Sequence, residues 1–285
     1  SANWYNRGAT QTSIIQYRLM NFDLKTIILS DRHIKKALEE FLSLPHDPKT
    51  ELKVSFLGGE PLLQFDVLEN LIHFIRRRSG PGILIHVFTN GTLLTPERVI
   101  FLLEQGVEVT ISLDGKKETN DRQRPFHNSA ESSVFEEVMK RLVGLPLGRM
   151  GVNLVFTRQS VGALLGNIHF FYEKGFSKIS FTPDLYEPWS TEELDQLALV
   201  MDSFGQYYRR LASGGARLFA ISNLYALLEK AEAAPEGEAY WWRDCHNLVL
   251  GADGRFYNCD KPLGFTFDQI TGHQTGSVEV GVDWV

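Results

Sequence analysis

Four short stretches of the sequence combine carboxylate, hydroxyl or amide side chains with turn-forming residues close to apolar runs. The first is Gly58-Gly59-Glu60-Pro61. Its adjacent glycines permit a sharp turn and leave backbone polar groups open to a ligand, while Glu60 adds a carboxylate and Pro61 stiffens the exit. The other three are Thr89-Asn90-Gly91-Thr92, Ser112-Leu113-Asp114-Gly115 and Asp121-Arg122-Gln123-Arg124-Pro125. Each stretch taken alone favours ordinary turn chemistry over a ligand site.

Cysteine is the other residue type that could do chemistry, and the chain contains 2 of them, Cys245 and Cys259. With Gly254 between them they form a C-x8-G-x4-C arrangement, flanked by Tyr257 and Asp260. Thiolates ligate iron–sulfur clusters, and a β-hairpin can bring two of them to one face. Two buried free cysteines are the alternative, since unpaired cysteine is commonly a small buried side chain. The spacing by itself favours neither.

Strand-like and helix-like periods alternate along most of the chain. Strands are expected at residues 12–19, 52–57, 83–88, 107–113, 152–156 and 178–182. Helical segments are expected between them, starting at Ser30, Val67, Thr95, Ser132 and Val161. Six strands with intervening helices predict an α/β fold with a parallel sheet, and in such folds ligands lie at the carboxyl ends of the strands. The first three polar stretches follow such ends.

After Thr182 the pattern changes. Ser190 and Glu193 predict a capping box that opens a long helix, and the pair Gly214 and Gly215 separates it from another helix near residues 221–231. A hairpin is expected at 248–250 and 255–257, around a turn that runs from Gly251 to Gly254. We place a domain boundary between about residues 213 and 240, with an α/β domain at 1–212 and a C-terminal extension at 213–285.

Composition narrows the class of protein. The chain has 285 residues, 43% of them hydrophobic, and a formal net charge of −6, which is typical of a globular protein with one large domain, alone or with a small appendage. The acidic balance argues against a protein held on nucleic acid by a basic surface. No apolar run approaches the roughly 18 residues of a membrane span, and the first residues do not resemble a signal peptide. We therefore expect a cytoplasmic enzyme.

In their order and spacing, the four polar stretches resemble the radical S-adenosylmethionine (radical SAM) enzymes. Within that family the sequence is most similar to the peptide- and protein-modifying branch that includes the sulfatase maturases, over about residues 50–185. The resemblance implies a partial (β/α)6 TIM-like barrel, in agreement with the six strands expected from periodicity, followed by a small C-terminal extension of hairpin and helix. It also implies two kinds of cofactor, S-adenosylmethionine and 4Fe-4S clusters.

The resemblance gives individual residues a role. The Gly-Gly-Glu-Pro turn of the family holds the amino group of the methionyl end of the cofactor, and the strand serine and the later arginine lie near the ribose and the carboxylate. The implied cofactor-binding residues are Gly58, Gly59, Glu60, Pro61, Asn90, Ser112, Asp114 and Arg124. The tail resembles the beginning of a cysteine-rich SPASM or twitch-type extension, which implies Cys245 and Cys259 as ligands of an auxiliary cluster.

The sequence departs from the family at the radical cluster. Family members hold that cluster with three cysteines in a C-x3-C-x2-C loop after the first strand, whereas no cysteine precedes Cys245 here. Placing Tyr17 at the aromatic position before the third cysteine puts the three ligand positions on Gln11, Ile15 and Arg18.

Two interpretations remain open at this point. Either the chain is a relative that has lost the cluster, or a cysteine-bearing segment of the full polypeptide is missing between Leu19 and Ser30, with another beyond Val285. Only about ten residues separate Leu19 from Ser30, fewer than the family's cluster loop needs, and this favours the second interpretation.

The activity implied by the resemblance is modification of a peptide or protein side chain, by hydrogen abstraction with a 5′-deoxyadenosyl radical. The implied partners are the peptide or protein substrate and an electron donor such as a flavodoxin or ferredoxin, with no nucleic acid and no membrane. One alternative is a cluster-free relative that acts as a peptide-binding scaffold or partner protein. Another is a barrel hydrolase or lyase that uses Glu60 and Asp114 as paired carboxylates.

Overall fold

The computed structural model describes residues 31–43, 52–57, 59–79, 82–126, 132–184, 188–221, 249–251, 254–257, 274–277 and 281–282. The chain divides into two compact units, one of Ser1–Gly8 with His86–Ala231 and one of Ala9–Ile85 with Glu232–Val285. Several expectations lie outside the described residues: the strand at 12–19, the missing segment between Leu19 and Ser30, Gly58, nearly all of the helix at 221–231, and both cysteines. The division into domains at residues 212 and 213 stays a prediction.

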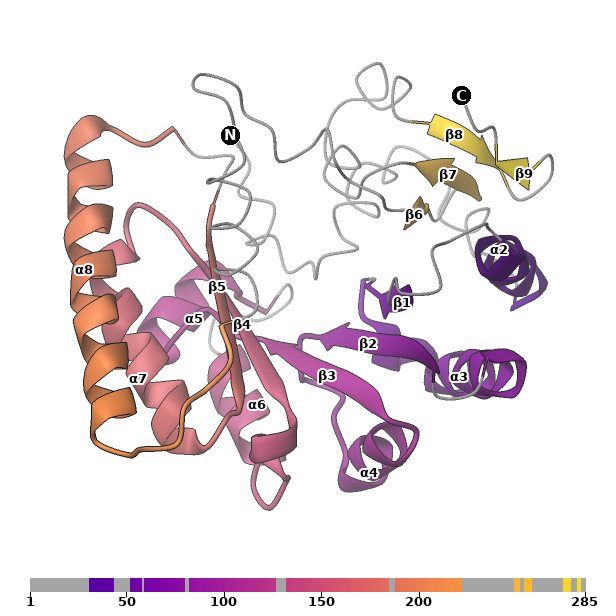
Figure 1. Ribbon diagram of the computed structural model, residues 1–285, viewed down its shortest axis with the longest axis horizontal. Coiled ribbons are helices and arrows are strands. Elements are labelled where there is room, and N and C mark those ends of the chain that lie inside the picture. Colours follow the sequence, from indigo (N-terminus) through magenta and orange to yellow (C-terminus); the bar gives the residue numbers. More distant parts are fainter. Residues whose placement is uncertain are drawn as a thin grey trace. The chain divides into compact units, whose positions relative to one another are not determined.

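Five strands form one sheet in the order of the chain (Figure 1). They are β1 (Leu52–Phe56), β2 (Ile83–Thr89), β3 (Val107–Ser112), β4 (Gly151–Phe156) and β5 (Lys178–Pro183). The pairs β3–β4 and β4–β5 are parallel. Each strand begins and ends within one residue of its expected position, because apolar runs bounded by turn residues define a buried strand well. The expected parallel α/β fold is therefore confirmed.

Helices follow the strands, as expected for parallel connections. They are α2 (Asp31–Ser43), α3 (Phe65–Ser79), α4 (Pro96–Glu104), α5 (Lys117–Gln123), α6 (Val134–Arg141), α7 (Leu164–Lys174) and α8 (Thr191–Ser213). Short 3-10 turns precede or separate them: η4 (Pro61–Gln64), η6 (Leu147–Arg149) and η7 (Val161–Ala163). The sequence did not predict α5, since its residues Lys-Glu-Thr-Asn-Asp-Arg-Gln have no apolar period, and its buried side chains are the amides Asn120 and Gln123.

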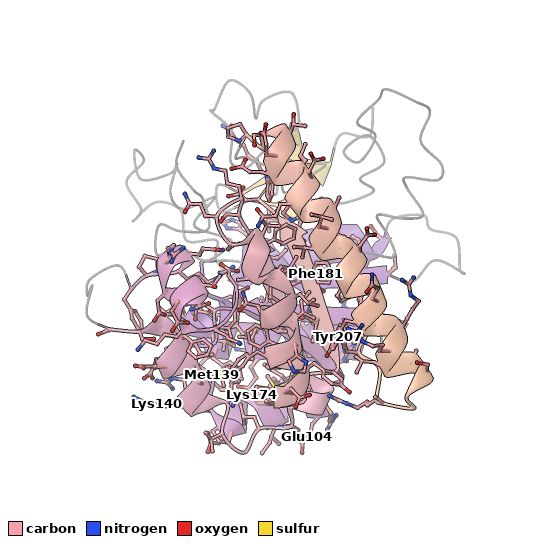
Figure 2. All side chains as sticks on the ribbon, turned by 90° about the vertical axis from the view of Figure 1, so that its left-hand side faces the viewer. Glu104, Met139, Lys140, Lys174, Phe181 and Tyr207 are labelled. Carbon is pink, nitrogen blue, oxygen red and sulfur yellow. The ribbon has the colours of Figure 1, made fainter. Side chains whose placement is uncertain are left out.

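The unit that contains His86–Ala231 has its core between the sheet and α7 and α8. Ile179 and Phe181 of β5 are buried, as is Phe171 of α7. The rings of Phe181 and Phe204 lie 5.1 Å apart between centroids, which joins β5 to α8. Figure 2 shows α7 and α8 side by side on this face of the unit. These apolar contacts fix the helices against the sheet and leave the strand ends to the polar stretches.

The long helix α8 begins and ends where the sequence predicts. The backbone N–H of Glu193 donates to the Ser190 hydroxyl over 3.3 Å, and the Ser190 N–H donates to the Glu193 carboxylate over 2.8 Å. This is the expected capping box. At the other end, Gly214 caps the helix after Ser213. In the part of the chain that the structure describes, no helix is long and apolar enough to cross a membrane.

The second unit contains α2, α3 and a small antiparallel sheet. The strands β6 (Val249–Leu250), β7 (Arg255–Tyr257), β8 (Gln274–Ser277) and β9 (Gly281–Val282) pair in that order. β6 and β7 form the expected hairpin, with Leu250 opposite Phe256. Phe256 and Ala37 of α2 are buried together, and Leu250 packs against them. The hairpin is therefore confirmed and has its own apolar contact within this unit.

Candidate functional site

Of the four predicted site residues in the turn after β1, the structure describes Gly59, Glu60 and Pro61, and Glu60 has a clear local role. Its carboxylate accepts the N–H of Leu62 over 3.1 Å and caps η4, while Pro61 occupies the first position of that turn. The Glu60 side chain is buried and Gly59 is partly buried. The turn thus holds its acid in a fixed orientation. Whether Gly59 and Glu60 hold a methionyl amino group stays a prediction.

The turn after β2 is held by its own side chains. The hydroxyl of Thr89 accepts the N–H of Gly91 over 3.0 Å. The amide oxygen of Asn90 accepts both the N–H and the hydroxyl of Thr92, over 2.8 and 2.7 Å. Gly91 has a φ of +82°, and a Cβ at this position would lie 2.8 Å from Cγ1 of Val138. The turn therefore needs glycine for both its backbone conformation and its packing.

The end of β3 places Ser112 next to two further polar side chains. Ser112 pairs with Asn153 of β4, and Asn153 pairs with Ser180 of β5. The neighbouring residues Val152 and Ile179 are fully buried in the core, so Asn153 and Ser180 point to the opposite face. Ser112, Asn153 and Ser180 thus form one polar row across three strands. The sequence did not single out Asn153 or Ser180, because only the register brings them level with Ser112.

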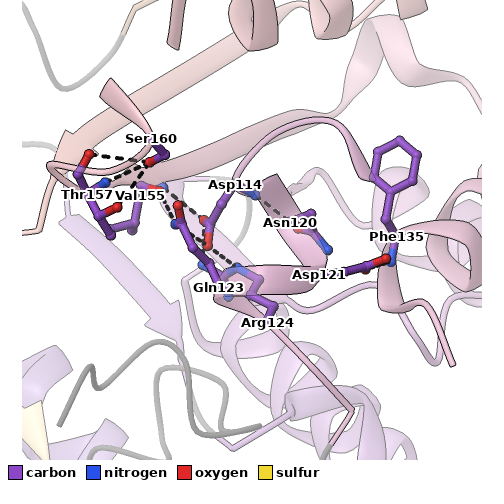
Figure 3. A network of polar contacts seen from close by, with 9 residues as sticks. All are labelled: Asp114, Asn120, Asp121, Gln123, Arg124, Phe135, Val155, Thr157 and Ser160. Carbon is purple, nitrogen blue, oxygen red and sulfur yellow. Dashed lines mark hydrogen bonds and ion pairs between the residues drawn. The ribbon is translucent and has the colours of Figure 1, made fainter. Parts of the chain in front are cut away.

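Just beyond Ser112, Asp114 is the centre of a buried polar network (Figure 3). Arg124 donates two hydrogen bonds to its carboxylate, from Nε and from one terminal nitrogen, each 2.9 Å long. Gln123 Nε2 donates over 3.1 Å and the backbone N–H of Val155 over 2.9 Å. Asp114 is 1% exposed and Arg124 7%. Each carboxylate oxygen accepts two hydrogen bonds, which uses the acceptor capacity of the group.

The short helix α5 and the residue that follows it supply three of the groups that surround Asp114. Asn120 accepts the backbone N–H of Asp114 over 3.1 Å, and Gln123 and Arg124 follow at the end of the helix. Spacings of three and four residues put these side chains on one side of a helix. The sequence contained this signal, but without apolar residues at the same spacing it did not indicate a helix. Asn120 and Gln123 are therefore site-region residues that sequence reasoning missed.

Some of the predicted site residues contact one another or lie on the same strand end, and others lie in separate turns. Asp114 and Arg124 form a bidentate ion pair, and Ser112 lies two residues before Asp114 on the same strand end. Asn90 holds a local turn. Glu60 belongs to the other unit. Among the described residues, no group of three histidine, cysteine, aspartate or glutamate side chains could hold a metal ion.

This geometry bears on the hydrolase or lyase alternative. A general base needs a carboxylate oxygen that can reach a substrate proton. The buried Asp114 carboxylate instead accepts four hydrogen bonds, and two of them come from a guanidinium. Paired acid–base catalysis by Glu60 and Asp114 therefore receives no support from the structure.

Comparison with known proteins locates the chain among families. Residues 25–157 match the model of the radical SAM superfamily. A cysteine-type anaerobic sulfatase-maturating enzyme of Clostridium novyi (strain NT) is 26% identical over 256 residues, which are 85% of this chain and 66% of that protein. The PqqA peptide cyclase of Bradyrhizobium diazoefficiens is 26% identical over 205 residues, 69% of this chain and 51% of that protein. The chain thus spans half to two thirds of these relatives.

Among solved structures, native anSMEcpe with bound AdoMet matches with a TM-score of 0.68 at 20% sequence identity, over 88% of this chain and 70% of that one. This likeness shows the fold, and it confirms the expected partial TIM-like barrel. The five consecutive strands of the sheet agree with it. Residues 25–157 of the chain therefore match the radical SAM superfamily, and proteins similar to the chain include anaerobic sulfatase maturases and a PqqA peptide cyclase.

Proposed function

We propose that the chain contains the S-adenosylmethionine-binding barrel of a radical SAM enzyme that modifies a side chain of a peptide or protein. The observation that carries this proposal is positional. The radical SAM match at residues 25–157 contains every candidate cofactor-binding residue, from Gly58 to Arg124. The strands whose ends carry Asn90, Ser112 and Asp114 belong to the sheet that the structure describes.

The described residues suit a polar nucleoside. Ser112, Asn153 and Ser180 place hydroxyl and amide groups in one row on the sheet face opposite the buried apolar residues. A parallel sheet covered on both faces by helices is normally apolar on both, so a polar row favours a face that contacts ligand or solvent. Glu60 and Gly59 would hold the methionyl end, and Ser112 the ribose. The activity that the resemblance implies would be removal of a hydrogen atom from a substrate side chain by a 5′-deoxyadenosyl radical derived from S-adenosylmethionine.

The radical cluster is where this sequence does not fit the family. Three thiolates are needed, and the only cysteines of the chain are Cys245 and Cys259. We therefore derive no chemical step through that cluster from residues 1–285. The proposal requires a further cysteine-bearing segment in the full polypeptide between Leu19 and Ser30. A role for Cys245 and Cys259 as ligands of an auxiliary cluster stays part of the proposal.

The substrate class rests on the relatives. The matching proteins act, by their names, on sulfatases and on the PqqA peptide, and solved structures of the same fold hold a Cp18Cys peptide or the precursor peptide SuiA. A peptide or protein is therefore the partner that we propose for this chain. The electron donor, a flavodoxin or ferredoxin, and the cytoplasmic location stay predictions.

Calorimetric titration of the purified chain with S-adenosylmethionine tests the cofactor. We expect saturable binding by the parent protein. Gly59→Val places a branched side chain in the turn before Glu60, and we expect it to abolish binding through a clash with the methionyl end while the thermal unfolding midpoint stays near that of the parent. Unchanged affinity in Gly59→Val would remove the assignment of this turn. A parent protein that binds no S-adenosylmethionine would remove the proposed function.

The lack of cysteine before Cys245 favours a second candidate, a cluster-free relative that binds peptide as a scaffold or partner protein. Anaerobic iron and sulfide analysis, combined with the intact mass of the expressed polypeptide, separates the two candidates. A mass of 32.4 kDa without iron would favour the scaffold. A larger mass, with iron and sulfide in the ratio of a 4Fe-4S cluster, would favour the radical enzyme.

A further inference from the structure

The backbone pairing of β3 and β4 stops where β3 ends, and β4 continues for three more residues. Ser112 is the last residue of β3 in register, opposite Asn153, and the next bond runs from the Leu113 N–H to the Asn153 carbonyl over 3.1 Å. Two residues further along β4, the N–H of Val155 donates to the Asp114 side chain over 2.9 Å. The Val155 carbonyl accepts from Nε2 of Gln123 over 2.7 Å. Side chains thus replace the backbone of β3 at the carboxyl end of β4.

Gln123 is the residue that joins the two strand ends directly. Its amide nitrogen donates to Val155 of β4 and also to the Asp114 carboxylate, over 2.7 and 3.1 Å. Both partners are acceptors, so the amide group must present its NH2 to them, and the opposite orientation would face oxygen with oxygen. The bridge therefore requires a side chain of this length with two N–H donors on one atom.

The same side chain has a cost in stability. Gln123 is 3% exposed, and its Oε1 atom is buried without a hydrogen-bond partner in the described part of the chain. A buried polar atom left unpaired is unfavourable. An apolar side chain of similar volume would avoid this cost, but it would leave the Val155 carbonyl without the N–H of Gln123. The position therefore holds a residue that keeps the two strand ends bonded at the expense of one unpaired atom.

We propose that Gln123 is a positioning residue for the S-adenosylmethionine site. By bonding Val155 and Asp114 together, it fixes the carboxyl end of β4 against that of β3. Ser112 and Asn153 form the last backbone pair before this point. The bonds of Gln123 therefore set where the side chains of Ser112 and Asn153 lie on the polar face. The inference rests on the proposed function, because it assigns the polar row to the cofactor.

The test compares affinity with stability in the full chain. Gln123→Met keeps the length of the side chain and removes both hydrogen bonds, and Gln123→Asn keeps the amide but is one methylene too short to reach both acceptors. We expect both variants to bind S-adenosylmethionine about tenfold more weakly in calorimetry, at a temperature where urea titration shows them fully folded, as befits the loss of buried hydrogen bonds. Gln123→Asn is the milder change and gives a folded protein if Gln123→Met does not.

The matched control is Ser190→Ala, which removes the cap of α8 and lowers stability without touching the strand ends. We expect it to bind S-adenosylmethionine with the affinity of the parent. If both Gln123 variants also bind like the parent, Gln123 is only structural and the inference is overturned by itself. If the parent protein binds no S-adenosylmethionine, the proposed function is overturned and the inference with it.

Discussion

The turn after β2 (Thr89 to Thr92) and the Asp114 network after β3, called the bridge below, have similar sequences at the strand end but are built differently. In the turn, Asn90 bonds to Thr92, two residues away. In the bridge, Asp114 bonds to Arg124 and to Val155, which are 10 and 41 residues away. Both stretches follow a parallel strand with a polar side chain and a glycine, and both were candidates for the cofactor site.

The difference shows what a polar side chain at a strand end can do. The side chain of Asn90 bonds within its own turn, to Thr92, so these hydrogen bonds do not depend on a distant segment of the chain. Asp114 exists as a buried carboxylate only because α5 and β4 both deliver donors to it. Loss of one partner therefore affects the turn weakly and the bridge strongly, since a buried charge without its partner is costly.

The largest effect is expected from Asp114→Ala. The substitution leaves the guanidinium of Arg124, which is 7% exposed, without its carboxylate, and it removes the acceptor of the Val155 N–H. We expect the free energy of unfolding to fall by about 3–5 kcal/mol, as for other buried ion pairs broken on one side. Urea titration at constant pH measures it.

The control for this variant is the double substitution Asp114→Leu with Arg124→Met. It removes both charges, so it should cost less free energy of unfolding than Asp114→Ala alone. If Asp114→Ala lost less free energy of unfolding than the double variant, the bridge would behave like a local turn. The contrast between the two regions would then fail.

Gly91→Ala is expected to have the next largest effect and tests how the turn after β2 depends on packing. The φ of +82° is unfavourable for alanine, and the new Cβ would lie 2.8 Å from Val138 and 3.0 Å from Ile111. We expect a loss of about 2–4 kcal/mol from strain and overpacking together. Gly144 has a φ of +78° with nothing within 4 Å of a Cβ, so Gly144→Ala isolates the strain. Equal losses in the two variants, measured by urea titration, would exclude the packing contribution.

Asn90→Ala is expected to have a smaller effect, because the two hydrogen bonds to Thr92 that it removes lie within the turn. The Thr92 N–H and hydroxyl both lose their acceptor. We expect a cost of about 1 kcal/mol in the free energy of unfolding. Asn90→Asp keeps an acceptor oxygen at the same place and should remain close to the parent. A loss in Asn90→Ala as large as that in Asp114→Ala would remove the distinction between a local turn and a cross-strand bridge.

The smallest effect is expected outside both regions, at the start of α8. Ser190→Ala removes a helix cap and should cost roughly 0.5–1 kcal/mol, which sets the scale for loss of one exposed bond. The pKa of Glu192 is lowered by its own backbone N–H and by the Ser190 hydroxyl, so this substitution should raise it toward its ordinary value.

Because the folded-state pKa of Glu192 is depressed, its contribution to stability is present above the ordinary glutamate pKa and is lost as the pH falls through the folded value. The difference between parent and Ser190→Ala should therefore narrow in acid. An NMR titration of the Glu192 carboxyl checks the shift, and an unchanged pKa in the variant would contradict the assigned cause.

The sequence by itself determined most of the helices and strands, and their order along the chain. The apolar runs of β1 to β5, the capping box of α8 and the hairpin of β6 and β7 all lie where periodicity and turn residues predicted them. These features are local, because a strand or a cap is defined by residues within a few positions of each other. The order of the four polar stretches was likewise enough to indicate the radical SAM family, which the match at residues 25–157 confirms.

Only the tertiary structure decided which polar residues act together. Gln123 and Asp114 bond to Val155 because β3 ends before β4 does. Ser112, Asn153 and Ser180 share a row because of the strand register. The sequence could not show this, since α5 has no apolar period and its polar side chains read equally well as a solvated loop. A buried hydrogen bond depends on the identity of a partner that lies far along the chain, and only the fold brings that partner within reach.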